Sequence, residues 1–313
     1  MAENEQPASQ AEQGTLRQLK LVLAYDGSRY HGWQSQSSGR GIQDALEKVL
    51  HRITGEHVIT HASGRTDTGV HALGQVVTFQ THEKHSLEIW HKALHGFLPL
   101  DIAVLSIEET PLTFHPRRLA KLKRYRYLWC DGPIPEVFAR RYLYTSRRPL
   151  NVNLMQEGAN ALLGRHDFIA YASSGSKRKT TERTVHELKI WRPFAPTYDG
   201  LPSRRSSGEN SADKMSVVPT NRGAGEGFEG SPPCTSVLRE YPILMRPEHL
   251  IALEILADGF LYNMVRIIAG TLTHIGAGSQ PVTWAADILA TKDRRQAGQT
   301  AEAQGLYLVE VLY

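Results

Sequence analysis

The first third of the chain alternates between two kinds of apolar pattern. Short runs rich in Val, Leu and Ile predict strands, whereas apolar residues spaced three or four positions apart predict helices with one buried face. The expected strands cover residues 20–25, 76–79 and 102–107, and the expected helices cover residues 42–53 and 87–94. The order strand, helix, strand, helix, strand is typical of a compact α/β unit.

A second set of elements follows in the rest of the chain. Strands are expected at residues 125–129, 185–191, 250–257 and 305–312, and helices at residues 154–163, 260–275 and 284–290. The second set is similar in content to the first, although the residues show no long internal repeat. The pattern hints at a fold made of two similar halves.

One segment lacks a periodic apolar pattern. Between residues 195 and 240, 18 of 46 residues are Gly, Pro or Ser. Such a segment buries too little apolar surface to offset the entropy cost of ordering it. We therefore expect a flexible insertion here, with a functional lid as the alternative.

Composition narrows the class of protein. The 313 residues correspond to about two domains, and the 41% hydrophobic and 22% charged residues are typical of a globular chain. No apolar run approaches the roughly 18 residues of a membrane span. The first 16 residues include several acidic positions and do not resemble a secretory signal, so we expect a disordered tail over residues 1–16.

The cysteine content points to a cellular compartment. The chain has two cysteines, Cys130 and Cys234. Two thiols cannot build a disulfide framework, and they cannot supply a four-thiolate zinc site. We therefore expect a cytoplasmic protein.

Positive charge is concentrated in one stretch. The net charge is +4, but residues 115–195 hold 17 Lys and Arg against 6 Asp and Glu, an excess of +11 that leaves −7 for the rest of the chain. Tyr125, Tyr127 and Phe168 lie in the same stretch. Cations interleaved with aromatic rings suit a polyanion whose bases can stack, such as a nucleic acid. A solvated basic surface is the alternative.

The residues with the densest candidate chemistry are 63–72, SGRTDTGVHA. Gly64 and Gly69 allow a tight loop that brings the backbone close to a ligand. Asp67 has Arg65 two positions away and a threonine on each side. A carboxylate held in this way can act as a nucleophile or a base. A structural turn with a capping Asp would contain similar residues.

The run GRTDTGVHALGQVV resembles the signature loop of the tRNA pseudouridine synthase A family. Other motifs of that family follow in the same order and with similar spacing: YDG at residues 25–27, GWQ at 32–34, IQ..LE at 42–47, FHxR at 114–117, KRYRY at 123–127, HDF at 166–168, RT at 183–184, NMVR at 263–266 and GLYL at 305–308. The resemblance covers residues 19–313 apart from the insertion.

The resemblance implies a fold and a reaction. The expected fold is α+β, with two similar α/β halves whose sheets join in a mainly antiparallel central sheet, and with a catalytic cleft between the halves. We expect an N-terminal domain over residues 17–112 and a C-terminal domain over residues 113–313. The expected enzyme is a homodimer that isomerises uridine to pseudouridine in the tRNA anticodon stem-loop, at positions 38–40. Breaking the C1′–N1 bond and rejoining uracil through C5 needs no redox step, cofactor or metal ion.

The resemblance also implies roles for particular residues. Asp67 is the expected catalytic carboxylate, and Arg266 the basic partner that keeps it ionised. Tyr125 is expected to stack on the target uracil and to help remove the C5 proton. Arg65 is expected to take the place of the flipped nucleotide in the stem. A basic run is expected to contact the tRNA backbone, namely Lys177, Arg178 and Lys179.

Two other classes of function stay open. A catalytically silent tRNA-binding or folding module is one, and the intact Asp67, Tyr125 and Arg266 argue against it. A carboxylate-dependent nucleoside glycosidase is the other. It would need a second carboxylate across the scissile bond, and the sequence around Asp67 offers none nearby. We interpret His71 as a residue that braces the loop rather than as a catalyst, and Asp167 as a residue that braces a turn.

Overall fold

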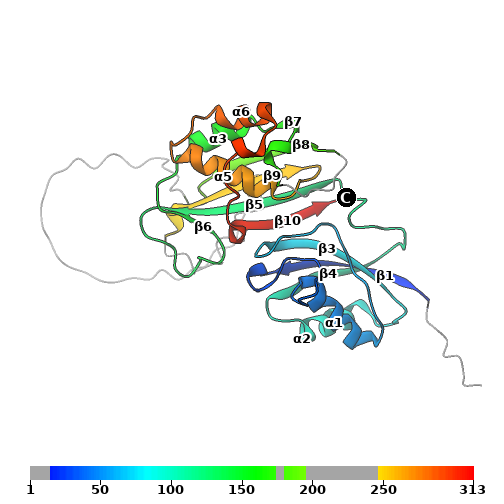
Figure 1. Cartoon of the computed structure of the whole chain (residues 1–313). Helices are drawn as coiled ribbons and strands as arrows, with labels where there is room; N and C mark the ends of the chain where they lie inside the picture. The colour runs from blue at the N-terminus through cyan, green and yellow to red at the C-terminus, as the bar shows by residue number, and fades with distance from the viewer. Residues whose placement is uncertain (1–14, 174–179, 195–245) are drawn as a thin grey trace, which may run out of the picture.

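One mixed sheet runs through the described part of the chain (Figure 1). The computed structural model describes residues 15–173, 180–194 and 246–313. The strands pair in the order β4-β1-β3-β10-β5-β9-β8-β7, with β2 beside β3 and β6 beside β5. Their bounds are β1 Arg17–Tyr25, β2 His61–Ala62, β3 His71–Thr81, β4 Ile102–Thr110, β5 Leu122–Asp131, β6 Tyr144–Ser146, β7 Gly164–Asp167, β8 Glu182–Trp191, β9 Leu250–Ala257 and β10 Leu306–Leu312. Most of the pairs are antiparallel, which confirms the expected α+β class with a mainly antiparallel sheet.

The N-terminal half of the sheet is built around β1. This strand pairs antiparallel with β3 on one side and with β4 on the other. Leu19, Leu21 and Leu23 on β1 are fully buried because alternate residues of a strand face the same way. The helices α1 (Ile42–Thr54) and α2 (Leu87–Phe97) pack on this half, in the lower part of Figure 1. These elements confirm the strands and helices expected over the first third of the chain.

The C-terminal half of the sheet contains β5, β9, β8 and β7, paired antiparallel in that order. The helices α3 (Val152–Asn160), α5 (Met264–Gly276) and α6 (Trp284–Thr291) pack on it, in the upper part of Figure 1. Tyr127 and Trp129 on β5 are fully buried in the core that includes these helices. None of the helices in the described ranges has the length and apolar character that a membrane crossing requires.

Two of the expected helices begin elsewhere, and in both cases an asparagine decides the start. The helix expected at residues 260–275 begins at Met264, because Asn263 adopts a left-handed conformation with φ 61° that interrupts helical geometry. The helix expected at residues 154–163 is Val152–Asn160, because the Asn151 side chain accepts hydrogen bonds from two backbone N–H groups of the first turn. The apolar pattern found both helices but not these ends.

Asp167 was expected to brace a turn, and it does so from the end of β7. Its Oδ1 accepts a hydrogen bond from the backbone N–H of Ile169 at 3.2 Å. Its Oδ2 lies 3.1 Å from Nζ of Lys292. Sequence patterns had missed β7 itself, a four-residue strand that pairs with β8. The division of the chain into domains at residue 112 stays a prediction.

The last strand of the chain, β10, joins the two halves of the sheet. It pairs parallel with β3 through Tyr307 opposite His71 and Leu308 opposite Ala72. On its other side it pairs antiparallel with β5, with Leu308 opposite Tyr125. Residue Leu308 therefore stands between Ala72 of the first half and Tyr125 of the second. This register brings the segment after Asp67 and the middle of β5 to the same part of the sheet.

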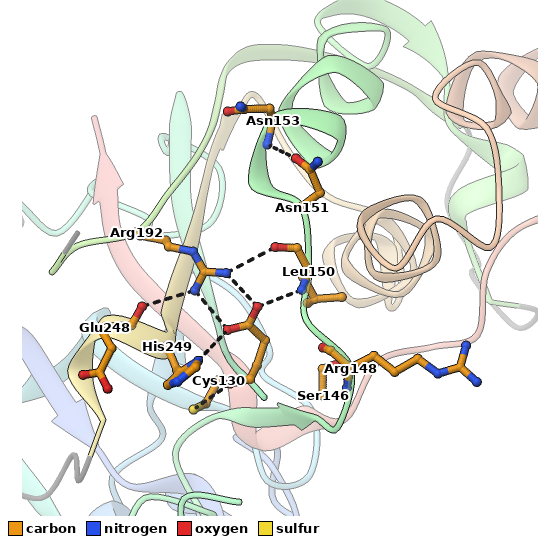
Figure 2. A network of polar contacts seen from close by, with 10 residues as sticks. Cys130, Ser146, Arg148, Leu150, Asn151, Asn153, Arg192, Glu248 and His249 are labelled. Atoms are coloured by element: carbon orange, nitrogen blue, oxygen red, sulfur yellow. Dashed lines mark hydrogen bonds and ion pairs between the residues drawn. The ribbon is translucent and has the colours of Figure 1, made fainter. Parts of the chain in front are cut away.

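A buried carboxylate fixes the far end of β5. Asp131, 2% exposed, binds Arg192 at 2.6 Å and accepts a hydrogen bond from the backbone N–H of Leu150 at 2.7 Å. Nδ1 of His249 lies 3.3 Å from its other oxygen. Figure 2 shows how Arg192, Leu150 and His249 converge from separate segments of the chain. Because its partners come from three segments, this group ties β5, β8 and the start of β9 together.

Candidate active site

Asp67 lies in the loop of residues 63–70 that connects β2 with β3. The fully buried side chain of Gln75, on β3, holds the first part of this loop. Its amide donates to the carbonyl of Gly64 at 2.8 Å, and its carbonyl accepts from the hydroxyl of Ser63 at 2.7 Å. Because these groups are buried, a lost partner would leave a polar atom unsatisfied. The loop is therefore held firmly at its beginning.

The segment that follows β1 supports the rest of the loop. The hydroxyls of Tyr25 and Thr66 share a hydrogen bond of 2.8 Å. A Cβ at Gly32, where φ is 82°, would lie 2.5 Å from the carbonyl oxygen of Thr66. A Cβ at Gly27 would lie 2.0 Å from the carbonyl oxygen of Val70. Only glycine allows backbones to approach so closely, which explains why the two glycine motifs accompany the Asp67 loop in the sequence.

The loop is also bound to the second half of the sheet. Nζ of Lys123, on β5, donates to the carbonyl of Ser63 at 2.7 Å. An ammonium group that binds a loop carbonyl fixes the spacing between β5 and the loop, because its hydrogen bond is charge-assisted. Asp67 is thus positioned by both halves.

Asp67 faces Arg266 on α5. Oδ2 of Asp67 lies 3.9 Å from Nη1 of Arg266, and the two side chains are 32% and 17% exposed. The guanidinium is held by two further contacts: Nε donates to the carbonyl of Ala301 at 2.7 Å, and Nη1 donates to Oδ1 of Asn263 at 3.0 Å. The left-handed Asn263 therefore both starts α5 and orients its arginine.

Burial and the ion pair act in opposite directions on Asp67. Burial raises the pKa of this carboxyl, and the positive charge of Arg266 lowers it, but the effect of burial is the larger. The charge of Arg266 favours the ionised form of Asp67, and the role of Arg266 as the partner that keeps Asp67 ionised stays a prediction. The pKa of Asp67 stays above its usual value in spite of Arg266.

Tyr125 is almost buried, at 9% exposure, on β5. Its ring packs edge-on against Phe260, with ring centres 5.0 Å apart. Tyr127, two residues further, points to the same face of the strand and donates to the carbonyl of Glu302 at 2.8 Å. The carbonyl of the preceding residue, Ala301, accepts a hydrogen bond from Nε of Arg266. Tyr125 therefore lies on the face of the sheet that carries Arg266.

The remaining site residues from the sequence have different outcomes. Arg65 is exposed on the same loop as Asp67 and has no ion pair or hydrogen bond within the described residues. Lys177, Arg178 and Lys179 lie outside the described residues. The roles assigned to all of these residues stay predictions.

His71, which we interpreted as a residue that braces the Asp67 loop, is the first residue of β3. It is 2% exposed, with Nδ1 3.2 Å from Oδ1 of Asp26 and Nε2 3.1 Å from the carbonyl oxygen of Arg141. Its ring stacks on Tyr307, with ring centres 4.8 Å apart. Burial works to raise the pKa of Asp26, but hydrogen bonds from His71 and Tyr142 contribute to holding it below its usual range. His71 thus braces the junction of the two halves.

Four positioning residues were not assigned a role from the sequence: Gln75, Tyr25, Lys123 and Asn263. Each lies inside a motif that the sequence displays, so the signal was present. A polar residue within an apolar strand, such as Gln75 in the run ALGQVV, indicates a buried hydrogen-bond partner. Within the described ranges, no three His, Cys, Asp or Glu side chains gather in a way that could hold a metal ion.

Fold and site together define a class of protein: an α+β chain that presents one loop carboxylate, paired with an arginine, where the two halves of a sheet join. Comparison with known proteins makes the class specific. The family model described as tRNA pseudouridine synthase matches residues 21–117 and 159–313. The chain therefore belongs to the tRNA pseudouridine synthase family, and it is an isomerase.

Curated relatives agree with this assignment. The chain is 36% identical over 298 residues to the tRNA pseudouridine synthase A of Thermoanaerobacter sp. (strain X514), a match that covers 95% of this chain and 100% of the relative. It is 36% identical over the same length to the protein of that name from Acetivibrio thermocellus, with the same coverage. The protein of that name from Legionella pneumophila (strain Lens) is 34% identical over 295 residues, with 94% of this chain and 92% of the relative covered.

Proposed function

We propose that this chain converts uridine to pseudouridine in the anticodon stem-loop of tRNA, at positions 38–40, in the cytoplasm and as a homodimer. The observation that carries the proposal is the pairing of Asp67 with Arg266 on the face of the sheet that also carries Tyr125. The names of the relatives support the tRNA substrate.

The reaction needs one group near the sugar and one near the base. The C1′–N1 bond of the uridine breaks, a C1′–C5 bond forms, the proton on C5 leaves and N1 gains a proton, so that no atom is added or lost. Asp67 supplies the carboxylate near C1′. Arg266 stabilises its negative charge, against a burial that favours the neutral acid. Tyr125 offers a ring on which the freed uracil stacks, and it assists removal of the C5 proton.

The substrate must be brought out of the stem. Extraction of a base costs a few kcal/mol, which contacts to the flanking RNA have to offset. Arg65 is exposed beside Asp67 and fills the space that the flipped nucleotide leaves. Lys177, Arg178 and Lys179 contact the backbone of the tRNA. A cleft between the two halves holds the stem-loop by shape and phosphate contacts, so that neighbouring uridines reach the same pocket.

The test uses tRNA transcripts labelled with tritium at C5 of uridine. Isomerisation releases this tritium to water, and mapping of pseudouridine identifies the position. We expect release from transcripts with uridine at positions 38–40, loss of release when these are cytidine, and loss of activity in Asp67→Asn with binding retained. Release of free uracil would indicate a glycosidase instead. Binding without either product would indicate a silent tRNA-binding module. Modification at other positions would refute the proposed site on the RNA.

A further inference from the structure

A basic hollow of about 480 Å³ opens beside the Asp67 loop. Three arginines from the two halves of the chain line it: Arg29, which follows β1, and Arg140 and Arg141, which lie between β5 and β6. All three are exposed. No carboxylate is among the lining residues. The volume is within the range of about 300–1,000 Å³ that ligand pockets span, and the charge selects an anion.

The hollow and the Asp67–Arg266 pair share their walls. Thr68 and Gly69, which directly follow Asp67, line the hollow. Because consecutive Cα atoms are about 3.8 Å apart, the Cα of Gly69 lies within about 7.6 Å of that of Asp67. The other shared wall is the segment of residues 301–304. One end of this segment binds Arg266, and the other end lines the hollow. An anion in the hollow would thus lie next to the reacting nucleotide.

Neither of the neighbouring carboxylates, Asp26 and Glu302, forms an ion pair with these arginines in the described part of the chain. Asp26 accepts hydrogen bonds from the hydroxyl of Tyr142 at 2.9 Å and from the backbone N–H of Ser28 at 2.9 Å, and its charge is directed at those donors. Glu302, on the segment that borders the hollow, accepts a hydrogen bond from Gln304. Of the three arginines, Arg140 donates a hydrogen bond to the backbone carbonyl of Val137 at 2.6 Å, which leaves its charge uncompensated.

From these observations we infer that Arg29, Arg140 and Arg141 bind one phosphodiester of the RNA, next to the uridine that enters the Asp67 site. The inference rests on the proposed function and adds a location for the phosphate contact. Because the arginines come from both halves of the chain, one phosphate bound here fixes the RNA backbone relative to Asp67. The three arginines act as binding and positioning residues, and they do not touch the reacting atoms.

The first measurement is the salt dependence of binding. Asp67→Asn serves as the background, so that the stem-loop binds without turnover. Neutralising one bound phosphate contributes about 0.7–0.9 to the log–log slope against salt. The triple change Arg29→Gln, Arg140→Gln and Arg141→Gln should therefore lower the slope by about 0.7–0.9, because the three cations share one phosphate. A matched control, Arg52→Gln on α1, removes one exposed cation that stacks on Phe97 and should leave the slope unchanged.

The second measurement locates the phosphate. Anticodon stem-loops are made with a single uncharged methylphosphonate linkage, placed in turn at each position around the target uridine. In the Asp67→Asn protein that keeps all three arginines, one linkage adjacent to that uridine should weaken binding about tenfold. In the triple variant, the same linkage should not weaken binding any further. Linkages elsewhere should weaken both proteins equally. Melting temperatures of all variants confirm that they are folded, and single Arg→Gln variants give the share of each arginine.

The outcomes separate the inference from the proposed function. If the unmodified chain forms no pseudouridine, the proposed function fails. If it is active but no linkage is coupled to the triple variant, the inference is wrong. Inorganic phosphate provides the last arm, at ionic strength matched with chloride. If phosphate binds through these arginines while no linkage is coupled, the hollow is a site for free phosphate, and the assignment to RNA is overturned.

Discussion

Arg266→Gln should raise the pH at which the enzyme loses activity on the acid side. In the proposed mechanism Asp67 acts as a carboxylate, and Arg266 favours that form from 3.9 Å. Two unit charges at this distance interact by about 1 kcal/mol in water and about 4 kcal/mol at an effective dielectric constant of about 20. Because one pKa unit corresponds to about 1.4 kcal/mol, an interaction of this size is large enough that removing the charge of Arg266 raises the pKa of Asp67 measurably. Both side chains are partly exposed, and we therefore expect an interaction energy in the lower part of that range.

The assay is tritium release from tRNA, measured as kcat/KM against pH, because this ratio reports the pKa of the free enzyme. Activity of the unmodified chain falls as pH drops through the pKa of Asp67, and in Arg266→Gln the fall occurs at a higher pH. Arg266→Lys is the matched control. It keeps the charge but loses the hydrogen bond of Nε to Ala301. The acid limb should then stay in place, although kcat decreases. An acid limb that does not move in Arg266→Gln would show that the arginine has no influence on the ionisation of Asp67.

Three further predictions concern stability and positioning. Burial raises the pKa of Asp67, so the charged carboxylate destabilises the folded state at any pH above the pKa that this group has in the unfolded chain. Asp67→Asn should therefore raise the melting temperature at pH 7. The gain should disappear below about pH 4, where the carboxyl is protonated in both states. Although burial opposes it, Arg192 holds the pKa of Asp131 low. The ionised Asp131 therefore stabilises the folded chain at any pH above the pKa of this group in the unfolded chain, and the contribution is lost as the pH falls through its pKa in the folded chain. Asp131→Asn should lower the free energy of unfolding by about 2–3 kcal/mol at pH 7, measured by chemical unfolding. Gln75→Leu leaves two buried loop groups unsatisfied and should cost about 2–4 kcal/mol and most of kcat. The exposed Gln80→Leu on the same strand loses one hydrogen bond to Gln18; it should cost less stability and leave kcat unchanged, and equal losses of kcat would contradict the anchoring role.

Local sequence patterns predicted the elements well, because each depends on residues close in the chain. The helix at residues 42–53 and the strand at 250–257 have clear periodicity, and both are present. The ends were harder where one side chain decides them, as the left-handed Asn263 does for α5. The short strands β2 and β6 were missed, because two or three residues carry no period that a pattern could show.

The candidate site depended on a different kind of signal. The resemblance supplied Asp67 and Arg266 as partners, and the structure places them 3.9 Å apart. Neither the periodicity nor the composition of the sequence predicts that distance, because it arises from the packing of α5, in the C-terminal half of the sheet, against a loop of the N-terminal half. The sequence also could not predict whether burial or the charge of Arg266 has the larger effect on the pKa of Asp67, since burial is a property of the folded chain. The same holds for Arg29 and Arg141, whose segments share a wall only after folding.

The way in which β10 joins the sheet limits how the enzyme can receive its substrate. The Asp67 loop is bound to the first half through Gln75 and to the second half through Lys123. Between them, β10 is hydrogen-bonded to β3 on one side and to β5 on the other. Moving the halves apart would break the backbone hydrogen bonds between β3 and β10 and the anchor of Lys123 on the loop together, a cost that would add to the cost of binding. We therefore expect the site to stay assembled while RNA binds, and the distortion to fall on the RNA. A flipped base costs only a few kcal/mol, a sum within the reach of a few phosphate contacts beside Asp67.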